Sequence, residues 1–265
     1  VINIYNNRWR VFYTFKIKSL YKVLVSLALV VALTACIFMI SNSTIMTSGE
    51  SRKLPVYRVD TGDQKVVALS FDAAWGADKT QGIIDILNKY NIKATFFLVG
   101  FWVDKYDNEV KKLAENGFDI GNHSHNHLKM STLQSKAIVE EIEYVNKKVE
   151  TLTGKRPYVF RAPFGDYNNR LIENVTNLKM QAVQWSIDTL DWKGLGADEI
   201  LNRVKSKASY GDIILFHNNS DHVLDALPKV IEYLLEKGYS FQTVSELVYK
   251  NGFNIDVNGV QHKEK

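Results

Sequence analysis

Short apolar runs alternate with helix-like segments along most of the chain after residue 65. The apolar runs predict seven strands, at residues 66–71, 94–99, 118–121, 158–161, 181–187, 212–216 and 239–243. Apolar residues at helical spacing predict helices at residues 78–90, 108–116, 135–152, 169–178, 197–207 and 223–236, and a short helix after the last strand. This alternation predicts an α/β fold of parallel strands joined by crossover helices, either an open doubly wound sheet or a barrel.

The loop after the first predicted strand argues against a nucleotide-binding fold. Residues 71–76 read FDAAWG and lack the glycine spacing of a dinucleotide fingerprint or of a P-loop. In a barrel, catalytic residues gather at the carboxyl ends of the strands. The strand ends are therefore where we expect the chemistry of this chain.

A different pattern lies near the N-terminus, where residues 23–40 (VLVSLALVVALTACIFMI) contain no charge. A run of this length is roughly what spans the hydrocarbon core of a bilayer as a helix. The polar residues 41–53 read as a linker, which leaves residues 54–265 as the folded domain. We expect an uncleaved single-pass anchor. The LTAC sequence of residues 33–36 leaves open a lipoprotein with a lipidated Cys36, or a cleaved signal.

The positive charge of the chain is concentrated before this apolar run. Residues 1–22 hold five cations and no acid: Arg8, Arg10, Lys16, Lys18 and Lys22. The positive-inside rule places this basic arm in the cytoplasm and the folded domain outside the cell membrane. Outside the arm, 28 of the 33 basic residues remain against 29 acidic ones, so we expect no nucleic-acid partner.

Ionisable side chains stand at the ends of five predicted strands. They are Asp72, the histidines within residues 123–127, Arg161, Asp188 with Asp191, and His217. Any single one of them is explained as a helix cap or as a satisfied surface group. Because the carboxyl ends of parallel strands meet at one rim of a barrel, the five together predict one catalytic site.

Two of the histidines, His123 and His127, are four residues apart. On a helical turn this spacing directs both imidazoles to one side, where they can reach one metal ion. His125 lies between them and would point elsewhere. Neutral imidazole suits zinc, cobalt or nickel, so the pair predicts a divalent metal, zinc first.

Taken in order, the strand ends resemble the motifs of the polysaccharide deacetylases, the NodB-homology group known as carbohydrate esterase family 4. The matching segments are residues 70–74 (SFDAA), 123–127 (HSHNH), 161–165 (RAPFG), 188–192 (DTLDW) and 215–217 (LFH). The FDAAWG variant, with a short chain and one N-terminal anchor, resembles the sporulation-associated, PdaB-type branch. The resemblance implies a distorted (β/α)7–8 barrel that removes N-acetyl groups from peptidoglycan or a related N-acetylated cell-wall polysaccharide.

The resemblance also implies how the metal and the attacking water would be handled. His123 and His127 would hold the metal, which would polarise the acetyl carbonyl and acidify a bound water. Asp72 would take the proton of that water as general base. Arg161 would keep Asp72 ionised, because a neighbouring cation favours the charged carboxylate.

The remaining implied roles concern the leaving amine and the substrate. His217 would protonate the amine, with Asp191 keeping its imidazole charged. The turn of Pro163, Phe164 and Gly165 would contact the substrate, with the Phe164 backbone N–H facing the developing oxyanion. Trp192 and Leu215 would wall the acetyl pocket.

One position departs from the family pattern. The family's third metal ligand is the second Asp of the first motif, where this chain has Ala73, and a methyl group cannot ligate. Asp78 is the nearest other acid along the loop, but we expect it to start the following helix. Two alternatives therefore remain: a catalytically silent glycan-binding or scaffold protein, and a metal-assisted amidohydrolase for a non-sugar amide. Trp75, Trp102 and Trp192 would suit stacking on sugar rings.

Overall fold

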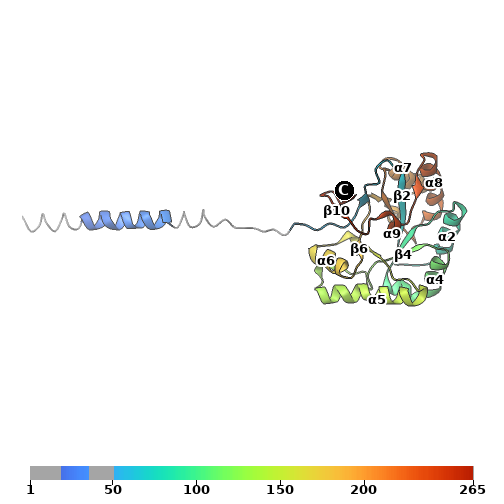
Figure 1. Cartoon of the computed structure of the whole chain (residues 1–265), viewed down its shortest axis with the longest axis horizontal. Helices are drawn as coiled ribbons and strands as arrows, with labels where there is room; N and C mark the ends of the chain where they lie inside the picture. The colour runs from blue at the N-terminus through green and yellow to red at the C-terminus, as the bar shows by residue number, and fades with distance from the viewer. Residues whose placement is uncertain (1–18, 36–50, 265) are drawn as a thin grey trace, which may run out of the picture. The chain divides into compact units, whose positions relative to one another are not determined.

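The computed structural model describes residues 19–35 and 51–264, and its contacts divide the chain into two units, Val1–Ser51 and Arg52–Lys265. In the first unit, residues 19–35 form one helix, drawn in blue in Figure 1. Within the described ranges, no helix has the length and apolar character that crossing a membrane requires. Residues 36–40 of the predicted anchor, including Cys36, most of the basic arm and most of the linker lie outside the described residues.

The second unit is built on a sheet of parallel strands, as the alternating pattern predicts. Its strands are β2 (Val66–Ala73), β3 (Thr95–Leu98), β4 (Asp119–Asn122), β5 (Val159–Phe160), β6 (Gln181–Ala182), β7 (Ile187–Asp188), β8 (Ile213–His217) and β9 (Ser240–Phe241). They are ordered β6-β5-β4-β3-β2-β8-β7, and β9 also pairs with β2. All eight residues of β2 are buried, which is why this central strand reads as a continuous apolar run.

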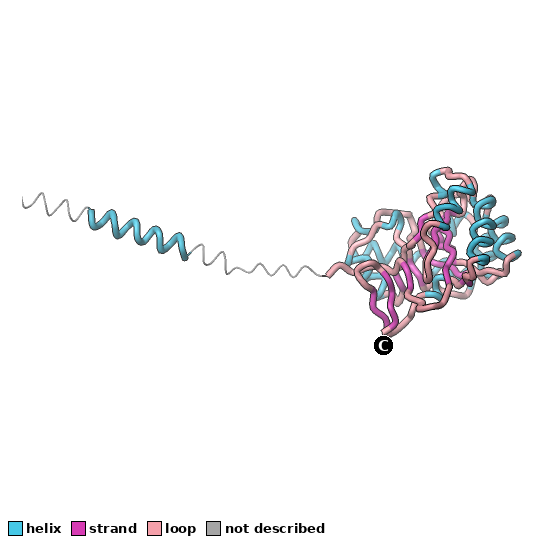
Figure 2. The backbone as a smooth tube through the Cα atoms, turned by 90° about the horizontal axis from the view of Figure 1, so that it is seen from above, coloured by secondary structure: helices cyan, strands magenta, loops and turns pink. Residues whose placement is uncertain are grey.

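Helices cover this sheet and supply the other half of the hydrophobic core (Figures 1 and 2). They are α2 (Thr80–Lys89), α3 (Gly100–Lys105), α4 (Asp107–Glu115), α5 (Ser135–Thr153), α6 (Asn169–Asn177), α7 (Ala197–Lys205), α8 (Val223–Glu236) and α9 (Val244–Leu247). The longest, α5, buries Ile138, Ile142, Val145 and Val149, the stripe that its spacing predicts. It ends at Gly154, whose φ of +72° closes the helix in the left-handed conformation that glycine adopts without steric cost.

The predicted α/β fold of parallel strands is confirmed. The strands form a half-barrel and not the predicted distorted (β/α)7–8 barrel. The segment predicted as one strand at residues 181–187 is two short strands, β6 and β7, at opposite ends of the sheet. The chain at residues 56–58 pairs beside β6, where Val56 bridges Val183, and just before β8, where Arg58 bridges Asp212. The Val56 N–H donates to the Ala182 carbonyl and the Val56 carbonyl accepts from the Gln184 N–H, so this segment, and not β7, borders β6.

A second, smaller sheet was not predicted from the sequence. It consists of β1 (Arg58–Val59), β11 (Val260–Lys263) and β10 (Phe253–Ile255), in the order β1-β11-β10. The helix α3 was also missed, because its six residues are too few to show a clear helical period. Three 3₁₀ turns complete the unit, η1 (Met130–Thr132), η2 (Pro163–Gly165) and η3 (Asp191–Lys193), and the last two carry predicted site residues.

Candidate active site

The carboxyl ends of the strands surround one cavity of about 670 Å³. Eight of the eleven predicted site residues line it: Asp72, His123, His127, Phe164, Asp191, Trp192, Leu215 and His217. Arg161 is fully buried beside the cavity, where it contacts Asp72. Pro163 is buried in η2, and Gly165 approaches the ring of Trp185, which is itself part of the cavity wall.

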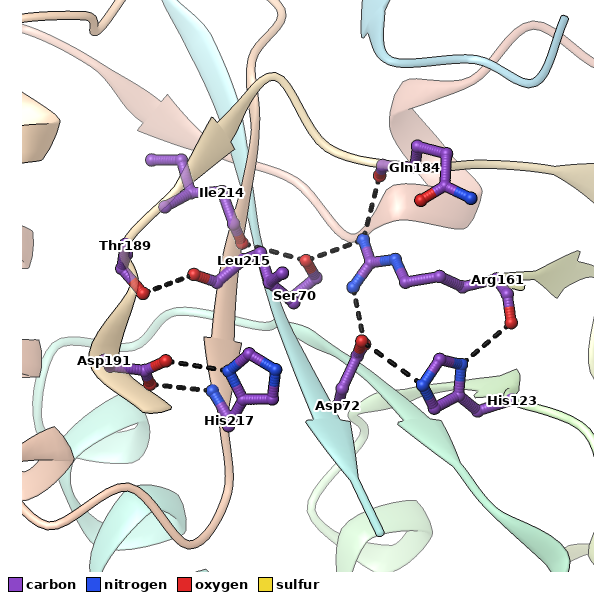
Figure 3. A network of polar contacts seen from close by, with 10 residues as sticks. All are labelled: Ser70, Asp72, His123, Arg161, Gln184, Thr189, Asp191, Ile214, Leu215 and His217. Carbon is purple, nitrogen blue, oxygen red and sulfur yellow. Dashed lines mark hydrogen bonds and ion pairs between the residues drawn. The ribbon is translucent and has the colours of Figure 1, made fainter. Parts of the chain in front are cut away.

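Asp72 and Arg161 form a buried ion pair at the centre of this arrangement. Arg161 Nη1 donates to Asp72 Oδ1 at 2.7 Å, and Nη2 donates to Ser70 Oγ at 2.9 Å and to the Gln184 carbonyl at 3.0 Å (Figure 3). The guanidinium also lies 4.0 Å from the centroid of the Phe97 ring. Burial raises the pKa of Asp72, but the charge and the hydrogen bond of Arg161, together with the nearby histidines, outweigh it and hold that pKa below its usual range. The carboxyl is therefore ionised.

The imidazole of His123 is fixed by the same segment that carries Arg161. Its Nδ1 lies 2.8 Å from the Arg161 carbonyl oxygen, which only accepts, so Nδ1 carries the proton and donates. Its Nε2 lies 3.4 Å from Asp72 Oδ2. Burial lowers the pKa of His123, so the ring is neutral and turns an unprotonated Nε2 toward the carboxylate. Two lone-pair groups face each other there, which suits an intervening proton donor or cation.

His127 lies close to His123, but not by the predicted helical turn. Residues 123–127 form a loop in which Ser124 and His127 have φ values of +64° and +54°. The Ser124 hydroxyl accepts a hydrogen bond from the His127 backbone N–H at 3.1 Å and closes the turn. The two imidazole centroids are 5.1 Å apart, and burial lowers the pKa of His127 to about 4. The two rings are therefore neighbours, although the predicted helical geometry is wrong. As expected, His125 points elsewhere, where it stacks on Tyr144.

His217 and Asp191 form a second charged pair on the β7–β8 side of β2. His217 Nδ1 lies 2.7 Å from Asp191 Oδ1, and the His217 backbone N–H donates to Oδ2 at 2.8 Å. Burial lowers the pKa of His217, but the hydrogen bond and charge of the Asp191 carboxylate outweigh it, and the pKa is raised. Figure 3 shows this pair on one side of Asp72, with His123 and Arg161 on the other.

Ala73, at the position of the family's third metal ligand, contributes to the core and is not part of the cavity wall. Its side chain is 1% exposed within the hydrophobic cluster, whereas the next residue, Ala74, lines the cavity. Over residues 19–35 and 51–264, no group of three or more His, Cys, Asp or Glu side chains is placed to hold a metal ion. His123 and His127 alone do not make up the ligand set that the resemblance implies.

The three tryptophans considered for sugar stacking separate into two groups. Trp75 and Trp192 line the cavity and are 58% and 57% exposed. Trp102 is 1% exposed, and its indole N–H donates to the Gly76 carbonyl at 2.7 Å, so its predicted contact with sugar is wrong. Trp102 instead anchors the loop that carries Trp75.

Sequence reasoning also missed residues that support the site. Ser70 holds Arg161 by accepting its hydrogen bond, while its own hydroxyl donates to the Ile214 carbonyl at 2.8 Å. Trp185 lines the cavity and lies 5.6 Å from the Arg161 guanidinium. A buried serine inside an apolar strand was the available signal for Ser70. Trp185 gave no signal, because its segment was predicted to be continuous strand.

Comparison with known proteins connects this geometry to a family. The family model described as polysaccharide deacetylase matches residues 59–183. A peptidoglycan-N-acetylglucosamine deacetylase of Bacillus cereus is 38% identical over 68% of this chain and 67% of its own length. The uncharacterized protein YlxY of Bacillus subtilis is 36% identical over 73% of this chain, which spans only 60% of YlxY.

Solved structures agree with this assignment. A CE4 family pseudoenzyme from Bacillus anthracis has a TM-score of 0.71 at 31% identity, over 79% of this chain and 73% of that chain. A mutant of the pseudoenzyme with restored enzymatic activity has the same TM-score at 34% identity, over 74% of this chain and 71% of that one. In sequence, in strand order and in the motifs at its strand ends, this chain belongs to the polysaccharide deacetylase family, carbohydrate esterase family 4.

Proposed function

We propose that this chain hydrolyses N-acetyl groups of a cell-wall glycan, peptidoglycan or a related N-acetylated polysaccharide. The observation that carries the proposal is the pairing of an ionised base and a charged acid at one cavity. Asp72 is held ionised by Arg161, and Asp191 raises the pKa of His217 and so favours its charged form. Hydrolysis of an amide needs both groups, a base for the attacking water and an acid for the departing amine.

Asp72 acts as the general base. Its Oδ1 is occupied by Arg161, while Oδ2 faces the cavity side where His123 Nε2 lies 3.4 Å away. A water at Oδ2 gives its proton to the carboxylate as its oxygen attacks the acetyl carbonyl carbon. Arg161 keeps the carboxylate ionised and oriented, and Ser70 and the Gln184 carbonyl hold the guanidinium in turn.

His217 acts as the general acid. With Nδ1 bound to Asp191, the proton available to substrate is on Nε2, and it passes to the amine nitrogen as the C–N bond breaks. The products are acetate and a glycan with a free amine. The turn of Pro163, Phe164 and Gly165, together with Trp192 and Leu215, surrounds the acetyl group. The Phe164 backbone N–H, in a turn held at a φ of +61°, faces the developing oxyanion.

Among the residues that the structure describes, His123 and His127 would be the only protein ligands of a divalent metal, which we expect to be zinc first, with cobalt or nickel next. Metal dependence is general in the family, but the donor set here is incomplete at Ala73. The steps above therefore rest on the protein's own acid and base. We infer weak metal binding for the chain as it stands.

A second candidate is a glycan-binding protein without hydrolysis. Ala73 favours it, as does the similarity to a CE4 pseudoenzyme whose mutant has restored activity. Both candidates bind the same N-acetylated glycan in the same cavity. They differ in whether the acetyl C–N bond breaks.

The deciding experiment measures acetate release by the full chain from an N-acetylglucosamine tetramer and from peptidoglycan, after chelation and after loading with zinc, cobalt or nickel. Deacetylation predicts acetate in at least one metal state, and His217→Ala should abolish it. Tetramer binding without acetate in every state would establish the silent candidate. Acetate from a small non-sugar amide alone would establish an amidohydrolase.

The N-terminal segments complete the proposal. We propose that residues 23–40 anchor the chain in the cell membrane with the basic arm 1–22 in the cytoplasm, the linker 41–53 outside and domain 54–265 facing the cell wall. The support is the uncharged run with five cations before it. Membership of the sporulation-associated branch stays a prediction from the FDAAWG variant.

A further inference from the structure

The rim of the cavity carries one exposed tryptophan, Trp75, that the proposed hydrolysis does not use. Trp75 follows β2 directly and is 58% exposed, although it lines the cavity. Its indole centroid lies 5.2 Å from the His127 ring and 6.3 Å from the Phe101 ring. The His127 ring is in turn 4.6 Å from Phe164, which is 64% exposed. The rings of Trp75, His127 and Phe164 form a contiguous aromatic band on the cavity wall, and Phe101 packs against Trp75 from outside the wall.

The loop that carries Trp75 is held in place from below. The carbonyl of the next residue, Gly76, accepts hydrogen bonds from the Trp102 indole at 2.7 Å and from the Asn218 side-chain amide at 2.8 Å. Gly76 has a φ of +65°, a left-handed conformation that glycine adopts without steric cost, so the turn projects the preceding side chain outward. An exposed indole on a fixed backbone loses little conformational entropy when a ligand covers it.

We propose that Trp75 is a stacking platform for a sugar ring adjacent to the one that is deacetylated, which makes the chain selective for a glycan oligomer over a monosaccharide. This rests on the proposed function only for the identity of the glycan. The base Asp72 and the acid His217 both line the cavity beside this band, so one sugar at the acetyl pocket leaves Trp75 to contact its neighbour. The axial C–H face of a pyranose is apolar and matches the flat face of an indole.

The other exposed tryptophan is less suited to this role. Trp192 directly follows the acid-positioning residue Asp191, and the Lys193 ammonium lies 5.1 Å from its ring centroid. One face of that indole is therefore near a cation, whereas no described cation stands over Trp75. Trp192 also belongs to the proposed acetyl pocket, so its removal would weaken binding of both the monosaccharide and the oligomer. Removal of Trp75 is expected to weaken binding of the oligomer alone.

The test compares the full chain with Trp75→Ala, Trp75→Phe and the control Leu235→Ala, which removes an exposed apolar side chain of α8 outside the cavity wall. Isothermal titration measures binding of the N-acetylglucosamine tetramer and of N-acetylglucosamine itself, without added metal. Trp75→Ala should weaken tetramer binding about tenfold, in the range for removal of a central tryptophan contact, and leave the monosaccharide within about twofold. Trp75→Phe should recover most of the loss, and Leu235→Ala should bind as wild type does.

The outcomes separate this inference from the proposed hydrolysis. Three results would overturn the platform. Trp75→Ala could lose as much affinity for the monosaccharide as for the tetramer, it could lose affinity for neither, or the wild type could bind the tetramer no more tightly than the monosaccharide. If the wild type binds the tetramer through Trp75 but releases no acetate, hydrolysis fails and the platform stands. If the wild type releases acetate and Trp75→Ala does so at unchanged KM for the tetramer, hydrolysis stands and the platform fails.

Discussion

Asp72 Oδ1 and Arg161 Nη1 lie 2.7 Å apart, and both side chains are buried, with Arg161 fully removed from solvent. The pair therefore has two functions that cannot be separated. It keeps the proposed base, Asp72, ionised. It also supplies the counter-charge of the buried Arg161 guanidinium, which forms no ion pair with any other carboxylate among the described residues. A change at Asp72 is expected to affect both catalysis and folding.

Asp72→Asn is expected to lower turnover by roughly 10²–10⁴-fold, the range for a positioned acid–base group. It also leaves a buried guanidinium without its counter-charge, which costs about 3–5 kcal/mol of folding free energy. Acetate release and thermal unfolding measure the two effects. Ser70→Ala is the matched control, because it removes the hydrogen bonds to Arg161 and to the Ile214 carbonyl but keeps the carboxylate, at about 2 kcal/mol. Wild-type turnover in Asp72→Asn would refute the base assignment.

The pH dependence of acetate release is expected to follow His217 on its alkaline side. The folded pKa of His217 is raised above its ordinary value of about 6.5, so the charged acid persists until the pH rises through that higher pKa. Activity should then fall. Asp191→Asn removes the carboxylate that raises the pKa, so the alkaline limb should move to lower pH. A limb at the same pH in both proteins would mean that His217 is not the titrating acid.

The free energy of unfolding that the His217–Asp191 pair contributes should also decrease as the pH rises. Because the folded pKa of His217 is above its unfolded value, the contribution is full below the unfolded pKa and is lost as pH rises through the folded pKa. Urea unfolding of the wild type and of His217→Gln, across this pH range, measures it. The difference between the two proteins should shrink as pH rises, and a constant difference would contradict the assignment.

Zinc binding is expected to depend on His123 and His127 and not on His125. His123→Ala and His127→Ala should each abolish whatever zinc binding the wild type shows in titration calorimetry. His125→Ala should leave it unchanged, because its ring stacks on Tyr144 away from the other two imidazoles. A loss in His125→Ala equal to the others would show that the metal pair is wrongly assigned.

A carboxylate at the end of β2 should tighten metal binding. Ala73→Asp places it at the family's ligand position, but inside the hydrophobic cluster, so the variant should unfold at a lower temperature without metal. Zinc should then raise its melting temperature more than it raises that of the wild type, since ligand binding to the folded state stabilises it. Ala74→Asp is the comparison, because Ala74 lines the cavity. A zinc response in Ala74→Asp alone would place the missing ligand one residue later.

Membrane topology can be tested independently of catalysis. A reporter that is active only in the cytoplasm, fused after Lys265, should stay silent if residues 23–40 export the domain. Replacing Arg8, Arg10, Lys16, Lys18 and Lys22 by Gln removes the charge that sets this orientation, and the reporter signal should rise. A reporter that is active in the unaltered chain would refute the proposed topology.

The sequence alone determined most elements of the main sheet and its helices, and the ionisable residues of the site. Apolar runs and helical spacing predicted the parallel α/β architecture, because a strand covered on both faces is mostly apolar, as β2 is apart from Ser70 and Asp72. Asp72, His123, Arg161 and His217 were found because ionisable residues stand at the ends of several apolar strands, and helix capping or surface exposure explains each one singly but not all of them together. Their convergence followed from the rule that parallel strands present their carboxyl ends at one edge.

Only the tertiary structure decided the features that depend on contacts between distant segments. Val56 and Arg58 bridge residues more than a hundred positions away, beside β6 and just before β8, and no local pattern records such pairing. The histidine pair is formed by a loop that contains two residues in the left-handed conformation. The spacing of the two histidines had predicted a helical turn. Trp75 and Trp102 look alike in sequence, but one indole is exposed at the cavity and the other is buried under its loop. Burial is a property of the packed chain, and it is what separates a residue that meets the substrate from one that holds the site in place.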